Sequence, residues 1–393
     1  MTVIPTAQRP HRAYRPTSCG AMRAAAALLA ALVAVVAAAP PAHADRTRDA
    51  QWHLKYLNVS QAHRLTQGQG VTVAVIDTGV DATHPGLATA VISGRDYANT
   101  PLDPPDGRRD TDGHGTAMAG LIAARGDGND GALGIAPQAT ILPVRRSEGG
   151  DLGRAGNTTA AIRWAVQQDV DVISMSFVEK DYFALAAAVE EARRANIVLV
   201  AGVGNRPEAT TVSYPAAYPG VIGVGLADRR GNASAMSVTG SGVDILAPAV
   251  DVMSTRLNGA YALTSGTSAA TALVAGAAAL VRAAHPDLSA AEVAHRLTST
   301  ATDKGAKGRD DQYGYGVLNL VAALTAEVPP LPAASADPTG DPTFTRPGPP
   351  PAALPDGSGT SGVAGAPIMG AGFLLLVLAA VGAFLWTRRR RAA

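Results

Sequence analysis

The sequence predicts an α/β domain in which helices cover both faces of a doubly wound, mainly parallel sheet. Short apolar, β-branched runs such as residues 71–76 (VTVAVI) have the length and composition of strands that are buried on both faces. Longer segments of helical character alternate with these runs, which is the order that places parallel strands in one sheet. Only 17% of the residues are charged and 42 are glycine, and small, uncharged side chains favour close packing of helices on a sheet.

Residues 1–44 have the three parts of a secretory signal peptide. Four arginines between positions 9 and 23 form a basic region, residues 24–39 are apolar, and Ala42-His43-Ala44 is a cleavage site. An uncleaved N-terminal membrane anchor is the alternative. The one cysteine, Cys19, lies in this segment, so the mature chain has no disulfide and no cysteine-based metal site.

Residues 45–70 form a short, polar N-terminal extension before the domain. Trp52, Leu54 and Leu57 are the apolar residues that anchor this segment on the domain, whereas His53 and His63 are expected on the surface. The domain itself spans residues 71–326. We expect its strands and helices, in chain order, at residues 71–76 (strand), 117–124 (helix), 140–144 (strand), 155–168 (helix), 170–175 (strand), 182–196 (helix), 197–201 (strand), 221–226 (strand), 263–281 (an extended run and a buried helix) and 289–299 (a helix opened by a capping box), with 314–323 closing the domain.

The C-terminal part predicts a linker and a membrane anchor. Residues 327–365 are rich in Pro, Gly and Ser, which is typical of a linker. Residues 366–386 are apolar and uncharged, and that length spans the roughly 30 Å hydrocarbon core of a bilayer as a transmembrane helix. Residues 387–393 contain four consecutive arginines, which mark a cytoplasmic tail. We therefore expect a single-pass protein of the cell membrane with its domain outside the cytoplasm.

Three polar residues stand at the ends of predicted elements. Asp77 follows the strand 71–76, His114 lies between two glycines at a helix start, and Ser268 begins the apolar helix after Gly266. Each alone has a plain structural reading, as a turn carboxylate, a structural histidine or a helix N-cap. Together they supply a nucleophilic hydroxyl, a base for its proton and a carboxylate that orients the base.

Three longer motifs resemble the subtilisin-like serine proteases. They are VAVIDTGVDATHPGL, DGHGTAMAG and SGTSAATALVAGAAAL, and they occur in that family's order across residues 70–285. The resemblance implies a subtilisin-like fold and a serine endopeptidase that acts on protein or peptide substrates through an acyl-enzyme, with Asp77, His114 and Ser268 as its triad. It also implies that Asn205, in VLVAGVGN, is the side-chain donor of the oxyanion hole. By the same resemblance we expect His114 to be neutral in the resting protein, so that activity falls as the pH drops through the usual histidine range.

The resemblance implies a substrate-binding strand as well. Residues 172–177 (VISMSF) are similar to the strand that pairs with a bound peptide, so Ser174, Met175 and Ser176 are the expected substrate-binding residues. The family usually has glycine where this chain has Val178, and a side chain there narrows the cleft.

Other polar residues near the motifs are interpreted as structural. His84, which precedes a proline, is the alternative base, and we interpret it as structural together with the loop carboxylates Asp81 and Asp112. We expect no cofactor and no metal in the chemistry. Structural calcium remains open, because relatives bind it although no acidic cluster here has the spacing of a calcium loop. The net charge of +1 gives no reason to expect nucleic acid as a partner.

The arrangement of segments resembles one branch of the family, the mycosins. These are membrane-anchored subtilases associated with type VII secretion in actinobacteria, and they combine a signal peptide, a short extension, a Pro-rich linker, one C-terminal span and a basic tail. The absence of cysteine from the mature chain departs from many mycosins. The resemblance implies membrane components of a type VII secretion system as partners. The alternatives are a mainly structural role in stabilising a secretion complex, and a general secreted protease.

Overall fold

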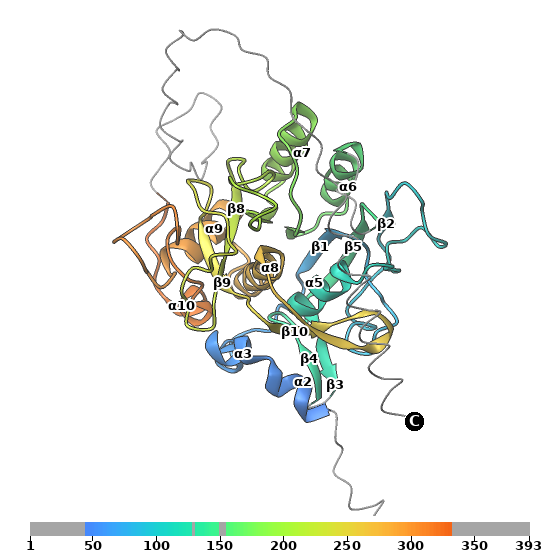
Figure 1. Ribbon diagram of the computed structural model, residues 1–393, viewed down its shortest axis with the longest axis horizontal. Coiled ribbons are helices and arrows are strands. Elements are labelled where there is room, and N and C mark those ends of the chain that lie inside the picture. The colour runs from blue at the N-terminus through green and yellow to red at the C-terminus, as the bar shows by residue number, and fades with distance from the viewer. Residues whose placement is uncertain (1–43, 128–129, 149–154, 332–393) are drawn as a thin grey trace, which may run out of the picture. The chain divides into compact units, whose positions relative to one another are not determined.

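The computed structural model describes residues 44–127, 130–148 and 155–331. The signal peptide up to residue 43, most of the linker, the transmembrane helix at 366–386 and the basic tail are predictions that lie outside the described residues. The described part is an α/β domain built around one sheet (Figure 1).

Seven parallel strands form the central sheet, in the order β2-β5-β1-β6-β7-β8-β9. The strands are β1 (Thr72–Asp77), β2 (Arg95–Asp96), β5 (Thr140–Arg145), β6 (Val172–Met175), β7 (Val198–Gly202), β8 (Val221–Ala227) and β9 (Ile245–Pro248). After β1 the chain builds β2 and β5 on one side, and it then crosses to β6 on the other side. The strand order therefore reverses between β1 and β6, and a crevice opens at the carboxyl ends of strands at such a point.

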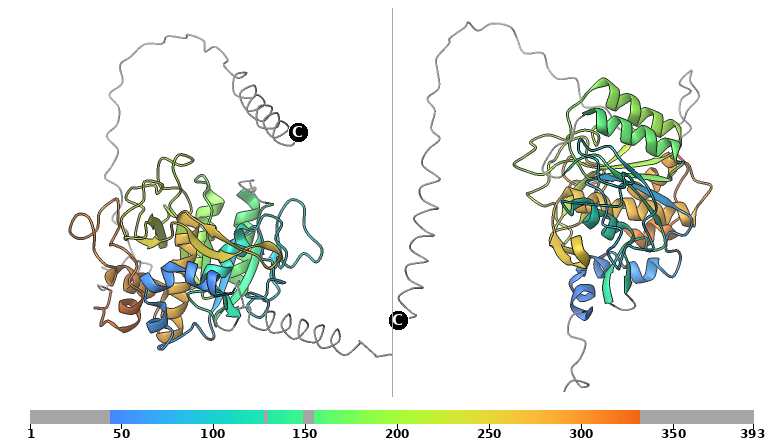
Figure 2. Two further views of the ribbon diagram at one scale, coloured as in Figure 1. Left: turned by 60° about the horizontal axis from the view of Figure 1, so that its bottom comes forward. Right: turned by 90° about the vertical axis from the view of Figure 1, so that its right-hand side faces the viewer.

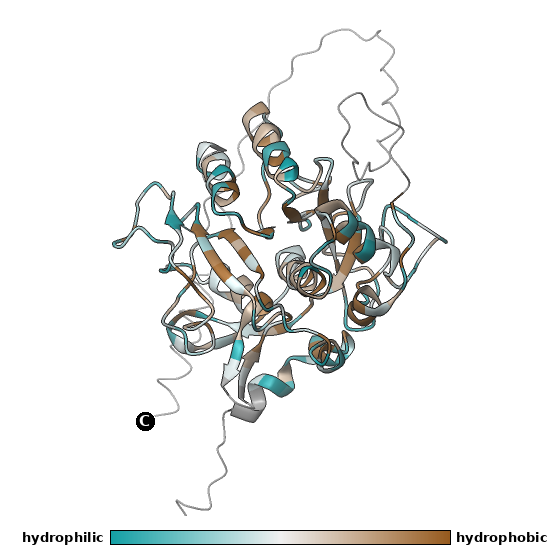
Figure 3. Cartoon of the chain, turned by 180° about the vertical axis from the view of Figure 1, so that it is seen from behind, coloured by the Kyte–Doolittle hydropathy of each residue, from teal (hydrophilic) through white to brown (hydrophobic). Residues whose placement is uncertain are grey.

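Helices cover both faces of this sheet, as the sequence predicts. The helices α5 (His114–Ala123) and α8 (Thr267–Ala284) pack on one face, and α6 (Ala155–Gln167) and α7 (Phe183–Arg194) pack on the other (Figures 1 and 2). Strand β1 shows how the residues divide between the faces. Val73 and Val75 join the core under α5 and α8, whereas Ala74 and Ile76 join the core under α6 and α7. Figure 3 shows the resulting hydrophobic colour on the central strands.

Helix α8 is the central helix of its face. Its 18 residues are apolar enough to cross a membrane, but 83% of them are buried inside the domain, so this is a core helix. Its glycine and alanine residues allow close contact. A Cβ on Gly276 would lie 2.7 Å from a carbon of Ile135, so only glycine fits there without a shift. Among the described residues α8 is the one helix with this combination of length and composition.

The N-terminal extension is helical and tied to the domain. It forms α2 (Ala44–Ala50), α3 (Trp52–Tyr56) and α4 (Val59–Ala62). The side-chain amide of Gln51, which is buried, donates to the carbonyls of Leu133 and Met253 and accepts from the Leu133 amide. Leu57 is buried in the core, as expected of an anchor. The surface prediction for His53 is wrong, because its side chain, in α3, is fully buried.

The smaller elements complete the domain. They are β3 (Arg125–Asp127), β4 (Asp130–Leu133), β10 (Val252–Thr255), the 3-10 turn η1 (Leu257–Gly259), β11 (Tyr261–Thr264), α9 (Ala290–Ser299) and α10 (Leu320–Thr325). The capping box predicted for α9 is confirmed, since Ser289 and Glu292 bond each other's backbone amides. Two antiparallel pairs, β3 with β4 and β10 with β11, were not predicted, although the extended run expected from residue 263 overlaps the end of β11.

Candidate active site

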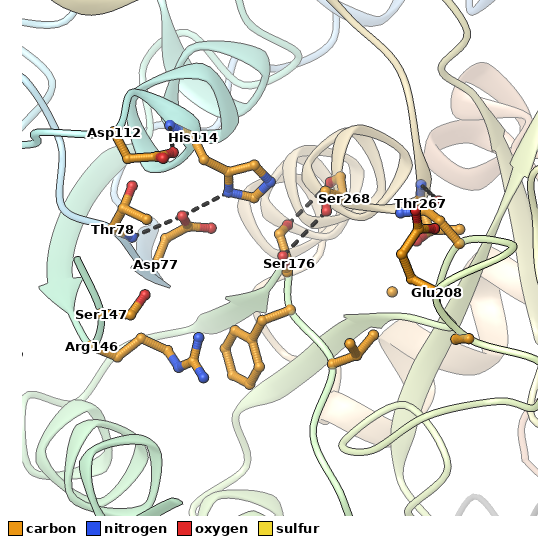
Figure 4. Close-up of a pocket in the computed structure, with 15 residues that line it drawn as sticks. Asp77, Thr78, Asp112, His114, Arg146, Ser147, Ser176, Glu208, Thr267 and Ser268 are labelled. Atoms are coloured by element: carbon orange, nitrogen blue, oxygen red, sulfur yellow. Dashed lines mark hydrogen bonds and ion pairs between the residues drawn. The ribbon is translucent and has the colours of Figure 1, made fainter. Parts of the chain in front are cut away.

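Asp77 ends strand β1 at the crevice and is buried. Its Oδ1 accepts a hydrogen bond of 2.8 Å from the backbone amide of Thr78 and one of 2.7 Å from Nδ1 of His114. Both bonds fix the carboxylate in one orientation. The second requires that the other ring nitrogen of His114, Nε2, faces away from Asp77 (Figure 4).

His114 is the first residue of α5, and the glycines beside it make this position possible. Gly113 has φ = 95°, which favours glycine. A Cβ on Gly115 would lie 2.1 Å from the carbonyl oxygen of Gly79, so the close approach of α5 to the end of β1 depends on that missing side chain. Asp110 and Asp112 accept the backbone amides of Gly113 and His114 and hold the turn that precedes the helix.

The carboxylates around His114 favour its charged form. Burial lowers the pKa of His114, but the charge of Asp77 and its hydrogen bond, together with the charges of Asp112 and Asp110, raise this pKa to about 9. The side chain is still 35% exposed, on its pocket side. This differs from the expectation of a neutral resting imidazole, because the sequence did not indicate that the charges of Asp77, Asp110 and Asp112 together raise the pKa of His114.

Ser268 is the second residue of α8, at the helix end whose first amides have no partner within the helix. Its hydroxyl donates to the carbonyl of Ser176 at 3.2 Å, and the hydroxyl of Ser176 donates to the Ser268 carbonyl at 3.1 Å. No hydrogen bond joins Ser268 to His114, both of which the structure describes, although the two residues line the same pocket (Figure 4). Such bonds often form only when substrate is bound.

Asn205 follows strand β7 and faces the same helix end. Its Oδ1 accepts the backbone amide of Thr267 at 2.9 Å, which turns the amide NH2 group away from that contact. It also lies beside Gly266, whose φ is 133°. This side chain therefore caps α8 with its oxygen and keeps its NH2 group as a donor in the pocket that Ser268 also lines.

These residues line a pocket of about 340 Å³ at the switch point of the sheet (Figure 4). The residues around it are Asp77, Thr78, Asp112, His114, Arg146, Ser147, Ser176, Phe177, Val178, Gly202, Asn205, Glu208, Ala209, Thr267 and Ser268. No residue of the described part of the N-terminal extension, 44–70, lines it.

Of the three predicted substrate-binding residues, only Ser176 lines this pocket. Ser174 and Met175 are buried in β6, which pairs with β1 on one side and with β7 on the other. Both backbone edges of these two residues are thus used inside the sheet, and no peptide can pair with them. The prediction for Ser174 and Met175 is wrong, and the segment that lines the pocket begins at Ser176, directly after β6 ends.

His84 and Asp81 lie outside the chemistry, whereas Asp112 lines the same pocket as His114. His84 is fully buried, accepts the Gly86 amide at Nδ1 and contacts the carbonyl of Ala260 through Nε2, as a structural residue does. Asp81 accepts the amides of Thr83 and Asn258. Within residues 44–127, 130–148 and 155–331, no three His, Cys, Asp or Glu side chains gather as metal ligands, and the expectation of no metal stays a prediction.

A buried ion pair beneath the pocket was missed. Arg146 bonds Glu179 at 2.9 Å, both side chains are almost fully buried, and the guanidinium lies 4.1 Å from the ring centre of Phe177. Thr158 bonds both charged groups. The backbone amide of Arg146 also donates to the Asp77 carbonyl at 2.8 Å, so this residue connects the end of β1 with the segment after β6. The residues come from separate parts of the chain, and no local pattern connects them.

The pocket therefore brings together a hydroxyl, an imidazole held by a carboxylate, and an amide donor at a helix N-terminus. A hydroxyl and a base on one side and hydrogen-bond donors on the other are the groups that acyl transfer needs. Nothing in the described residues requires a cofactor for this chemistry.

Comparison with known proteins gives one consistent result. The subtilase family matches residues 68–316. Subtilisin DY of Bacillus licheniformis is 38% identical over 265 residues, which cover 65% of this chain and 92% of that protein. The subtilisin of Bacillus pumilus is 38% identical over 260 residues and is covered to 91%. Among solved structures, MycP1 with its N-terminal propeptide removed matches with a TM-score of 0.63 and 30% identity, covering 71% of this chain and 98% of that one.

Proposed function

The chain belongs to the subtilase family of serine peptidases, and from this premise we propose that Ser268 is its nucleophile, His114 its general base and Asp77 the carboxylate that orients His114. The observation that carries the proposal is the 2.7 Å bond between His114 Nδ1 and Asp77 in the pocket that Ser268 lines. Asp77 fixes the tautomer that leaves Nε2 free to accept a proton.

In the proposed reaction, the Ser268 hydroxyl gives its proton to His114 Nε2 while its oxygen attacks the peptide carbonyl. The negative charge that forms on the carbonyl oxygen is stabilised by the NH2 group of Asn205 and by the free backbone amides that begin α8. The protonated His114 then donates to the leaving amine, which leaves an acyl-enzyme on Ser268. Water attacks this ester by the same route, with His114 again as the base.

The test uses the full chain and a fluorophosphonate probe, which forms a covalent bond with an activated serine. We expect the wild type to be labelled and Ser268→Ala to remain unlabelled. Ser265→Ala is the matched control, because this nearby serine lies outside the pocket and bonds Asp251 instead. Labelling that persists in Ser268→Ala, or its absence from the wild type, would contradict the assignment. We expect EDTA to leave the labelling unchanged, because no step requires a metal.

The finer proposal is that this protease is a mycosin, anchored in the membrane with its domain outside the cytoplasm. The match to MycP1 over nearly that whole chain supports it, and so do the signal peptide and the C-terminal apolar segment of the sequence. Its partners are then protein substrates and the membrane components of a type VII secretion system.

The membrane orientation of the protein and its role in export are tested by separate experiments. The predicted mature chain lacks cysteine, so single substitutions report exposure: a membrane-impermeant maleimide should label Ser358→Cys in intact cells but label Ala393→Cys only after lysis. The reverse pattern would contradict the orientation. Complementation of a deletion strain with Ser268→Ala tests the role. Export that continues without cleavage favours the structural role, and export that stops favours proteolysis.

A further inference from the structure

The substrate residue that precedes the cleaved bond is here called P1. Two segments of the chain border the position that this residue must occupy. In the proposed reaction His114 protonates the leaving amine, so the part of the substrate after the bond lies on the His114 side of Ser268. The P1 residue lies on the opposite side, toward Asn205. There the chain leaves the neighbouring strands β6 and β7 as residues 176–178 and 203–205. Ser268 is held between them, since its hydroxyl bonds Ser176 and the preceding Thr267 amide bonds Asn205.

Val178 and Ala209 close the gap between these two segments. A Cβ built on Gly204 would lie 3.6 Å from Cγ1 of Val178 and 2.9 Å from Cβ of Ala209. Cγ1 of Val178 and Cβ of Ala209 therefore lie no farther apart than these two distances added together. A substrate carbon between them would need about 3.5–4.0 Å to each side. No methylene fits in this gap, and Ser213, whose Oγ would lie 3.4 Å from the same point, borders it as well.

We propose that Val178 and Ala209 restrict this protease to substrates with a small P1 residue, namely glycine, alanine or serine. The inference rests on the proposed function and specifies its substrate class. Both side chains line the pocket beside Asn205. They are aliphatic and carry no polar atom, and a long side chain finds no space between them. Glu208, exposed at the pocket rim, is the competing determinant and would favour a basic P1 residue.

The experiment measures the inactivation of the full chain by peptidyl diphenyl phosphonates that differ only at P1. These probes react with an activated serine and place their P1 side chain in the pocket. We expect the alanine probe to inactivate the wild type at least about tenfold faster than the phenylalanine or lysine probe. In Val178→Gly the ratio of phenylalanine to alanine rates should rise by about 10- to 100-fold, the range for a side chain admitted to an apolar pocket.

Further variants keep the test independent of folding defects. Ala209→Gly removes the opposite wall and should raise the same ratio, whereas Val178→Ile keeps the gap closed and should leave it as in the wild type. A wild type that prefers phenylalanine or lysine, or a ratio that is unchanged in both glycine variants, would overturn the inference. The fluorophosphonate distinguishes the two proposals: labelling of Ser268 with the wrong P1 preference defeats only this one, whereas no labelling in any variant defeats the proposed function and this inference with it.

Discussion

His114 forms a hydrogen bond with Asp77, and the charges of Asp112 and Asp110 also stabilise its protonated form. Because the pKa of His114 is raised to about 9, only a minor fraction of the imidazole is neutral at pH 7. We expect kcat/KM to increase with pH up to about 9 rather than to level off above the usual histidine range. A pH profile with peptide substrate measures this. A plateau from pH 7 onward would show that the ring is already neutral there.

Asn205 allows its two roles to be separated by substitution. Asn205→Ala removes both the NH2 donor and the oxygen that accepts the Thr267 amide, whereas Asn205→Asp keeps an acceptor and loses the donor. If the donor stabilises the oxyanion, both variants should lower kcat by about 10²–10³-fold with little change in KM. If only Asn205→Ala loses activity, the residue acts through the cap on α8 instead.

At the scale of elements, the start of α5 depends on a single missing side chain. Gly115→Ala would bring a Cβ within 2.1 Å of the Gly79 carbonyl oxygen and 3.1 Å of the Asp77 Cβ, so α5 must move away from β1. We expect about 1–3 kcal/mol of lost stability and a large loss of activity. Gly156→Ala in α6 is the matched control, because nothing lies within 4 Å of its Cβ and it should be neutral or slightly stabilising. Thermal unfolding and fluorophosphonate labelling of both variants measure this.

The buried ion pair between Arg146 and Glu179 should contribute more to the free energy of unfolding than an exposed ion pair does. Glu179→Gln leaves a buried guanidinium without its counter-charge and should cost about 3–5 kcal/mol. Glu191→Gln breaks the exposed pair with Arg163 and should cost less than about 1 kcal/mol. Denaturant unfolding of the two variants gives both values. Equal losses would mean that the buried pair contributes no more than the surface pair.

The sequence predicts those elements that a local pattern of residues defines, and it does not predict contacts between distant segments. The strands β1, β5, β7 and β8 were predicted because strands buried on both faces appear as continuous apolar runs. Strand β6 was recognised, but its neighbours come from β1 and β7, so the sequence did not show that Ser174 and Met175 are closed to a peptide. The pairs β3–β4 and β10–β11 are short and partly polar, and the only part of them that a local pattern marks is the end of β11, as the extended run before α8. The motifs of the site were recognised because their residues lie within a few positions of one another.

At the scale of the whole domain, His114 and His53 make stability depend on pH in opposite directions. The raised pKa of His114 means that its protonated form is favoured by folding, so its contribution is complete below pH 6.5 and is lost as the pH rises through about 9. His53 is the reverse case. Burial lowers the pKa of His53 to about 3, so between pH 6.5 and 3 the unfolded chain binds a proton that the folded chain excludes, and stability is lost as the pH falls through that window.

The prediction for the whole domain is that His53→Leu makes it more resistant to acid. No described residue offers a hydrogen bond to either ring nitrogen of His53, so the substitution removes a buried polar group without breaking a bond. We expect equal or higher stability at pH 7 and an advantage over the wild type that grows as the pH falls below 6.5. Thermal unfolding between pH 4 and 8 measures this, with His63→Leu as the control. That variant loses the contact of His63 with the Ile135 carbonyl and should be less stable at pH 7. An advantage of His53→Leu that stays constant with pH would mean that the ring is protonated in the folded domain, and that α3, which carries His53, opens to admit water.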